Sequence, residues 1–122
     1  MSTRPDWSIV FYVEDNGRSP VREFLSTLDQ VAQARCMVAI DRLRVENIRA
    51  REPLVKKIEG NIWELRRESR GNIYRLLYFF FTGRKIVLLH AFQKKTQRTP
   101  RQEIKLAQRR LNHFVRREGD ET

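Results

Sequence analysis

Residues 53–97 read PLVKKIEGNIWELRRESRGNIYRLLYFFFTGRKIVLLHAFQKKTQ, and this stretch decides the fold. Turn sequences interrupt it at Gly60-Asn61, at residues 69–72 and at Thr82-Gly83, as is typical between consecutive strands. The segments between these turns are rich in the aromatic and branched residues that favour strands. Because side chains alternate between the two faces of a strand, we expect one packed face and one face on which cations converge. These cations are Lys57, Arg66, Arg75, Lys94 and Lys95.

The segment before this stretch predicts one strand and two helices. Residues 7–13 (WSIVFYV) have the composition of a strand. Ser19-Pro20 is a helix start, with serine as N-cap and proline at the first helical position, and this short helix is expected to end near Leu28. A second helix is expected from Asp29 to about Ile48. Neither helix carries a pattern of chemical groups, so we expect both to support the sheet.

The segment after the stretch predicts a C-terminal helix. Thr99-Pro100 followed by Gln102 matches a capping box, and Ile104, Ala107 and Leu111 then follow at the spacing of a buried helical face. The order of elements predicts an α+β fold, with a largely antiparallel sheet of about four strands packed against two N-terminal helices, plus the C-terminal helix. A chain of 122 residues is the length of one domain, residues 1–122.

Charge is distributed unevenly along the chain. The net charge is +10, yet residues 1–50 hold seven cations and seven anions, so the whole excess lies in residues 51–122. A basic half predicts an anionic partner, with nucleic acid ahead of an acidic protein or a membrane surface. The alternative is a solvated charged surface.

Several classes of protein lack support in the sequence. There is no phosphate-binding glycine loop, no dinucleotide fingerprint and no Cys/His metal spacing, so we expect neither a cofactor nor a metal. No apolar run is long enough for a membrane helix, and the first residues lack the apolar segment of a signal peptide, which favours a cytoplasmic protein. The lone Cys36 lies on the apolar stripe of the second helix, where we expect a buried thiol.

A cationic cluster without a metal can still cleave RNA, because the RNA supplies its own 2′-hydroxyl as nucleophile. Catalysis then needs a group that takes the 2′ proton, cations that stabilise the extra phosphorane charge and an acid for the 5′-oxygen. Arginine suits the charge-stabilising role because its planar fork binds phosphate oxygens in pairs.

Arg75 is the most informative single cation, because it lies within the apolar segment IYRLLYFFF, where a charge is costly without a partner or a site. The alternative to a site is an ion pair with Glu64 or Glu68 of the neighbouring strand. Tyr74 and Tyr78 share the strand face opposite Arg75, so the two sets cannot face one cleft unless a bulge intervenes.

Two segments, KKIEGNIWELRRESRGNIYRLLYFF and IVLLHAFQKKTQRTPRQEIKLAQRR, carry the ordered motifs W-E-L-R, Y-R-x-x-Y, H-x-F-x-K-K-T and T-P. In this combination the chain resembles the phage-derived, HigB-like toxin branch of the RelE/ParE superfamily. The resemblance implies a compact RelE-like domain and a toxin of a type II toxin–antitoxin system. Such toxins enter the ribosomal A site and cut mRNA there as metal-independent endoribonucleases, and their partner is usually a helix-turn-helix antitoxin.

The resemblance also implies roles for particular residues. Arg66 and Arg75 are expected to hold the scissile phosphate, and Lys57 or Lys94 to assist charge neutralisation or proton transfer. Tyr78 and His90 are further catalytic candidates, although a hydrogen-bonded core imidazole is the alternative for His90. Further contacts to RNA are expected from Lys56, Arg67, Lys95, Arg98 and Arg101. The general base, the codon preference and the mode of neutralisation by the antitoxin are not encoded in these motifs.

Two other functions fit the same patterns. The ParE branch of the superfamily poisons gyrase, and the basic surface could also belong to a non-catalytic RNA- or ribosome-binding module.

Overall fold

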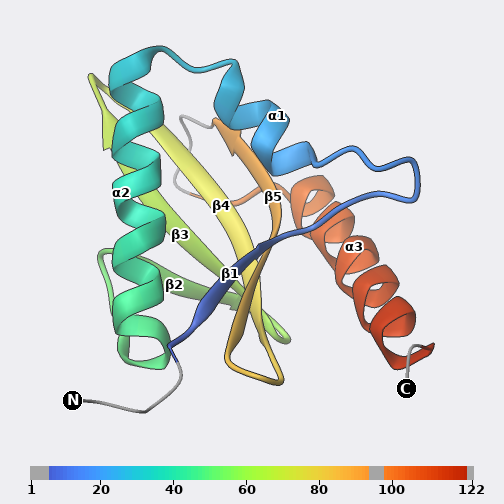
Figure 1. Ribbon diagram of the computed structural model, residues 1–122. Coiled ribbons are helices and arrows are strands. Elements are labelled where there is room, and N and C mark those ends of the chain that lie inside the picture. Colours follow the sequence, from blue (N-terminus) through green and yellow to red (C-terminus); the bar gives the residue numbers. More distant parts are fainter. Residues whose placement is uncertain (1–5, 94–97, 121–122) are drawn as a thin grey trace.

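The computed structural model describes residues 6–93 and 98–120 and shows one five-stranded sheet between helices (Figure 1). The elements in chain order are β1 (Ser8–Phe11), α1 (Pro20–Ser26), α2 (Gln30–Glu46), the 3-10 turn η1 (Asn47–Arg49), β2 (Val55–Glu59), β3 (Ile62–Ser69), β4 (Asn72–Phe81), β5 (Lys85–Gln93) and α3 (Arg101–Asp120).

The sheet has the strand order β1-β5-β4-β3-β2. Strands β2 to β5 form consecutive antiparallel hairpins, and β1 pairs in parallel with β5. The hairpin turns contain Gly60 and Gly71 with φ of +56° and +83°, a conformation that glycine adopts without steric cost. The predicted α+β class with a largely antiparallel sheet is confirmed. The expected count of four strands is wrong, because Val55–Glu59 forms a strand of its own before the Gly60-Asn61 turn.

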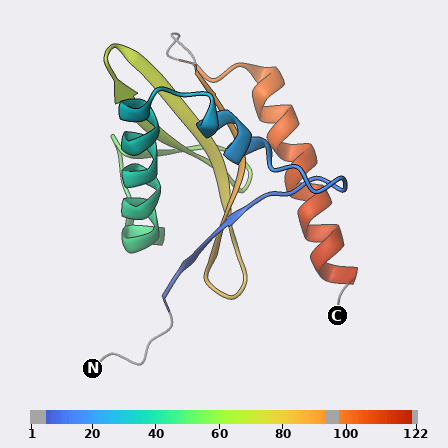
Figure 2. The same cartoon turned by 45° about the horizontal axis from the view of Figure 1, so that its top comes forward.

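The helices cover both faces of the sheet (Figures 1 and 2). Helices α1 and α2 pack on one face, where Leu25, Cys36, Ile40 and Leu43 meet Leu65, Tyr74, Leu76, Tyr78 and Leu88. Helix α3 packs on the other face, where Ala107, Leu111 and Phe114 meet Ile62, Leu77, Phe79, Val87 and Leu89. The expectation of a sheet packed on only one face is therefore wrong. Cations occupy the part of the second face that α3 leaves uncovered.

The helix ends differ from the sequence prediction in three places. Helix α2 ends at Glu46 rather than near Ile48, because Asn47 adopts a φ of 43° and the chain continues as a 3-10 turn. At the start of α1, the Ser19 side chain makes no capping hydrogen bond. Helix α3 begins at Arg101, and the Thr99 hydroxyl donates to Glu64 Oε2. None of the described helices is long and apolar enough to cross a membrane.

Candidate active site

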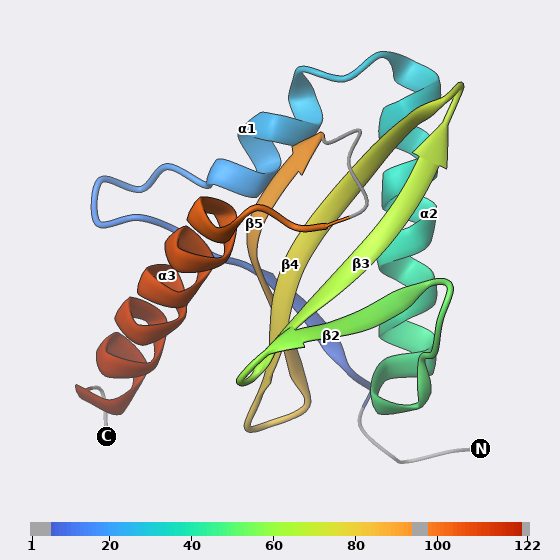
Figure 3. The same cartoon turned by 180° about the vertical axis from the view of Figure 1, so that it is seen from behind.

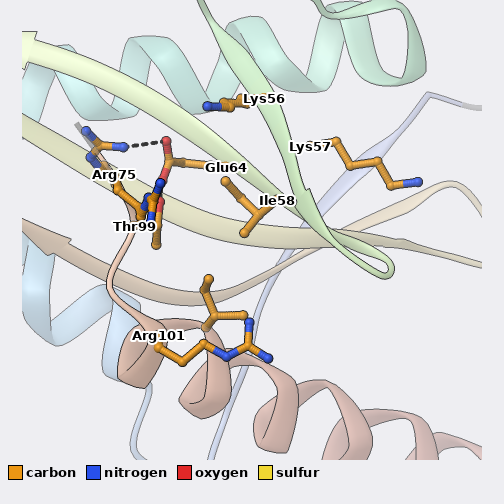
Figure 4. A pocket seen from close by; sticks show the side chains of 9 residues that line it. Lys56, Lys57, Ile58, Glu64, Arg75, Thr99 and Arg101 are labelled. Atoms are coloured by element: carbon orange, nitrogen blue, oxygen red, sulfur yellow. Dashed lines mark hydrogen bonds and ion pairs between the residues drawn. The ribbon is translucent and has the colours of Figure 1, made fainter.

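A buried ion pair lies at the centre of the face that α3 leaves uncovered. The Arg75 guanidinium of β4 donates to Glu64 Oε1 of β3 at 2.8 Å, and the two side chains are only 3 % and 2 % exposed. Figure 4 marks this interaction with a dashed line. The Thr99 hydroxyl donates to the other carboxylate oxygen at 2.5 Å. The ion pair with Glu64, the alternative considered for Arg75, is therefore present. It fixes both side chains in one orientation.

The ion pair lies against a hollow of about 580 Å³, which we call the central cavity. Among the described residues, Glu64 is the only carboxylate that lines it. The cations that line it are Lys56, Lys57, Arg75, Arg98 and Arg101, and Ile58, Thr99 and Ile104 complete the wall. The structure thus places one fixed carboxylate among several cations, an arrangement suited to an anionic ligand that also carries a proton to be removed.

Arg66 lies beside this pair. It is the direct cross-strand neighbour of Arg75 in the β3–β4 register, so both side chains leave the same face of the sheet. A smaller hollow of about 200 Å³, the small cavity, is lined by Glu52, Pro53, Val55, Lys56, Glu64, Arg66 and Arg75. The structure therefore brings together the two arginines predicted to hold a phosphate.

The two lysines of β2 point in different directions. Lys56 pairs with Glu64 in the β2–β3 register and lines both cavities. Lys57 pairs with Trp63, and its Nζ lies 5.8 Å from the centre of the Trp63 ring. In Figure 4 the Lys57 side chain extends away from the Arg75–Glu64 pair. Of the two, Lys56 is the better placed beside the ion pair, whereas the motifs predicted an assisting role for Lys57 or Lys94.

The remaining predicted RNA contacts are spread around the site. Arg98 and Arg101 line the central cavity, and Arg101 also forms an exposed ion pair with Glu59. Arg67 lies opposite Tyr74, on the strand face that carries α1 and α2. Lys94 and Lys95 lie outside the described residues.

The structure does not bring Tyr78 to this face. Its side chain is fully buried in the core beneath α1 and α2, as the strand alternation predicted. Burial raises the pKa of the Tyr78 hydroxyl well above its usual value, so it stays protonated near neutral pH. A catalytic role for Tyr78 would require a contact with RNA that the fold prevents.

His90 is held between β5 and α3. The β4–β5 register shifts at this point, since Leu77 pairs with His90 whereas Tyr78 pairs with Leu88. His90 Nδ1 lies 3.1 Å from the Arg110 guanidinium, and Nε2 lies 2.8 Å from Glu103 Oε1. Because a guanidinium can only donate, Nδ1 accepts, and Nε2 donates its proton to Glu103. Burial lowers the pKa of His90, partly offset by Glu103. The ring lines neither cavity, in agreement with the alternative of a hydrogen-bonded core imidazole.

Glu64 is the residue that sequence reasoning missed as part of the site. The sequence motifs indicated Glu64 only as an ion-pair partner. The signal was its position two residues before Arg66 on one strand, which places both on the same face. Within the described part of the chain, no three His, Cys, Asp or Glu side chains are grouped so as to hold a metal ion.

Comparison with known proteins supplies the family. A family model described as phage derived protein Gp49-like (DUF891) matches residues 23–112. This chain belongs to the phage-derived Gp49-like family. Two relatives named probable endoribonuclease HigB1, from Mycobacterium tuberculosis strains CDC 1551 and H37Rv, are each 33 % identical over 110 residues, which is 90 % of this chain and 86 % of theirs. These findings confirm the resemblance seen in the sequence motifs.

The part of this Gp49-like chain that the family model matches contains the whole site. Residues 23–112 include β2, β3 and β4 and the first turns of α3, which together carry Lys56, Glu64, Arg66, Arg75 and Arg101. The site therefore belongs to the region shared with the family.

Proposed function

We propose that this Gp49-like protein is the toxin of a type II toxin–antitoxin system and cleaves mRNA in the ribosomal A site, with a helix-turn-helix antitoxin as its partner. The observation that carries the proposal is the buried Arg75–Glu64 pair beside a cation-lined cavity. The relatives named as probable endoribonucleases support the same reaction class.

The geometry supports cleavage by the RNA's own 2′-hydroxyl. Glu64 takes the proton from this hydroxyl as the 2′-oxygen forms a bond to phosphorus, and the hydrogen bonds from Arg75 and Thr99 hold the carboxylate in place. The extra negative charge on the phosphorane falls beside Arg75 and Arg66, which stabilise it. The bond from phosphorus to the 5′-oxygen then breaks. Lys56 supplies the proton for this oxygen, which leaves a 2′,3′-cyclic phosphate and a 5′-hydroxyl.

Ribosome dependence has a physical reason. A small site with few proton-transfer groups gains most when another structure holds the RNA with its 2′-oxygen in line with the bond that breaks. The basic half of the chain would also contact ribosomal RNA through phosphates, so binding should weaken steeply with salt. The ribosome then provides orientation and the toxin provides the charges.

Primer extension on a defined mRNA in a reconstituted translation reaction tests the proposal. The parent protein, Glu64→Gln and the control Lys105→Gln are compared with and without ribosomes, since Lys105 is exposed on α3 and lines neither cavity. We expect cuts within A-site codons for the parent and the control, only with ribosomes, and a loss of about 10²-fold or more for Glu64→Gln. An mRNA with one 2′-deoxyribose at the cut position should stay intact. Intact mRNA with translation blocked would favour the binding module, and intact mRNA with normal translation would direct attention to gyrase.

A further inference from the structure

A third hollow continues the site toward the edge of the sheet. This edge cavity has a volume of about 520 Å³. It shares Glu52, Pro53 and Arg66 with the small cavity, which in turn shares Lys56, Glu64 and Arg75 with the central cavity. The three hollows therefore adjoin one another, from the start of α3 to the connection between η1 and β2, and we call them together the groove. Figure 3 shows the face along which these elements follow one another.

The edge cavity has an excess of arginine. Five arginines and three glutamates line it, namely Arg42, Arg49, Arg51, Arg66, Arg67, Glu46, Glu52 and Glu68, together with Pro53 and Leu54. Arg42 is already paired with Glu46. In the part of the chain that the structure describes, the other four arginines have no carboxylate oxygen within 4.0 Å, although Arg18, Arg44 and Arg117 elsewhere do.

The state of Arg66 and Arg67 strengthens this point. Both are only partly exposed, and the Arg67 Nε atom is buried without a hydrogen-bond partner among the described residues. A guanidinium that is partly removed from water without a partner costs free energy. An anionic ligand in the edge cavity would instead pair with the parts of the two guanidinium groups that line this cavity.

We propose that the groove is a track for single-stranded RNA, and that Arg49, Arg51, Arg66 and Arg67 bind the phosphate of a nucleotide next to the one that is cut. This inference rests on the proposed function, because it takes RNA as the substrate. Among the residues that the structure describes, no aromatic side chain lines the edge cavity, so this contact offers no platform for stacking a base. The site therefore binds the backbone and tolerates any base at that position.

Arg49 and Arg51 allow a clean test, because both are exposed and lie outside the central and small cavities. Arg49→Gln/Arg51→Gln is compared with Arg35→Gln/Arg116→Gln, which removes the same charge from exposed positions that line none of the three hollows. The probe is a fluorescent 12-nucleotide RNA whose 2′-O-methyl groups prevent cleavage. Fluorescence anisotropy gives Kd over a range of salt, and thermal unfolding checks that both variants fold.

We expect the Kd of Arg49→Gln/Arg51→Gln to rise about tenfold or more at low salt, since two charge-assisted contacts are lost. The slope of log K against log salt should become shallower by roughly 0.7 relative to the parent, because the edge cavity is proposed to bind one phosphate of a single strand. Equal losses in the test and control variants, or no loss in either, would overturn the track.

The outcomes separate this inference from the proposed function. If the parent cuts ribosome-bound mRNA but Arg49→Gln/Arg51→Gln binds RNA like its control, the track is wrong and the cleavage proposal stands. If the variant loses RNA affinity as expected but the parent never cuts, the track stands and the cleavage proposal fails.

Discussion

Replacement of Arg75 tests whether the Arg75–Glu64 ion pair is shielded from solvent in the folded protein. Arg75→Met keeps most of the volume of the side chain but removes its positive charge. The Glu64 carboxylate, which is 2 % exposed, then keeps the hydrogen bond from Thr99 but loses the one from Arg75. Since both partners are almost fully buried, solvent screens their interaction very little. The substitution should therefore expose the full cost of an uncompensated charge.

The expected magnitude follows from this burial. Removing one partner of a buried ion pair lowers the free energy of unfolding by about 3–5 kcal/mol. This is a large share of the 5–15 kcal/mol by which a domain is typically stable. With a urea m-value of roughly 2 kcal/mol/M, the midpoint should fall by about 2 M. Replacing both partners in Arg75→Met/Glu64→Leu should cost less than either single change, because both charges of the pair are then removed together.

Urea unfolding followed by circular dichroism measures all four proteins of this double-mutant cycle. The reasoning is refuted if Arg75→Met changes the free energy of unfolding by less than about 1 kcal/mol, since the pair would then be solvated. It is also refuted if the double variant loses as much stability as the two single variants combined.

Three further predictions concern residues outside the cavities. Tyr78→Phe should raise the free energy of unfolding by about 1 kcal/mol in urea titrations, because it removes a buried hydroxyl that has no hydrogen-bond partner in the described part of the chain; a clear loss of stability would contradict this. Because burial lowers the pKa of His90 in the folded protein, the unfolded chain binds more protons than the folded protein at pH values just below the ordinary histidine pKa of about 6.5. Unfolding free energy should therefore fall as the pH drops through that window, with a smaller slope in His90→Gln, whereas equal slopes would exclude His90 as the cause. Burial raises the pKa of Cys36 to about 11, so a thiol reagent at about pH 8 should label the protein only in urea; rapid labelling of the folded protein would place this thiol at the surface.

The sequence predicted the parts of the fold that depend on local patterns. The turns at Gly60-Asn61 and Thr82-Gly83 separate strands as expected, and the inward positions Ala107 and Leu111 of α3 are buried. The alternation along β4 also correctly placed Tyr78 on the face opposite Arg75. These features follow from the periods of strand and helix and from turn chemistry.

Features that depend on contacts between elements far apart in the chain could not be predicted from the sequence. The choice between Lys56 and Lys57 depends on the register between β2 and β3, and a shift of one residue reverses it. The pattern Thr99-Pro100 with Gln102 predicted Thr99 as a helix cap. The sequence does not show that the Glu64 carboxylate lies within hydrogen-bond distance of the Thr99 hydroxyl. For the same reason the sequence predicted Glu64 as a partner of Arg75 but not its position in the wall of the central cavity.

The most direct test of the central claim uses the double variant Arg75→Met/Glu64→Leu, once the urea curves show that it is folded. Its cleavage of ribosome-bound mRNA is measured by primer extension beside the parent and Lys105→Gln. If the Arg75–Glu64 face is the active site, the parent and Lys105→Gln produce A-site cuts and the folded double variant produces none. A double variant that cuts the same codons at the rate of the parent would contradict the assignment and place the chemistry elsewhere on the molecule.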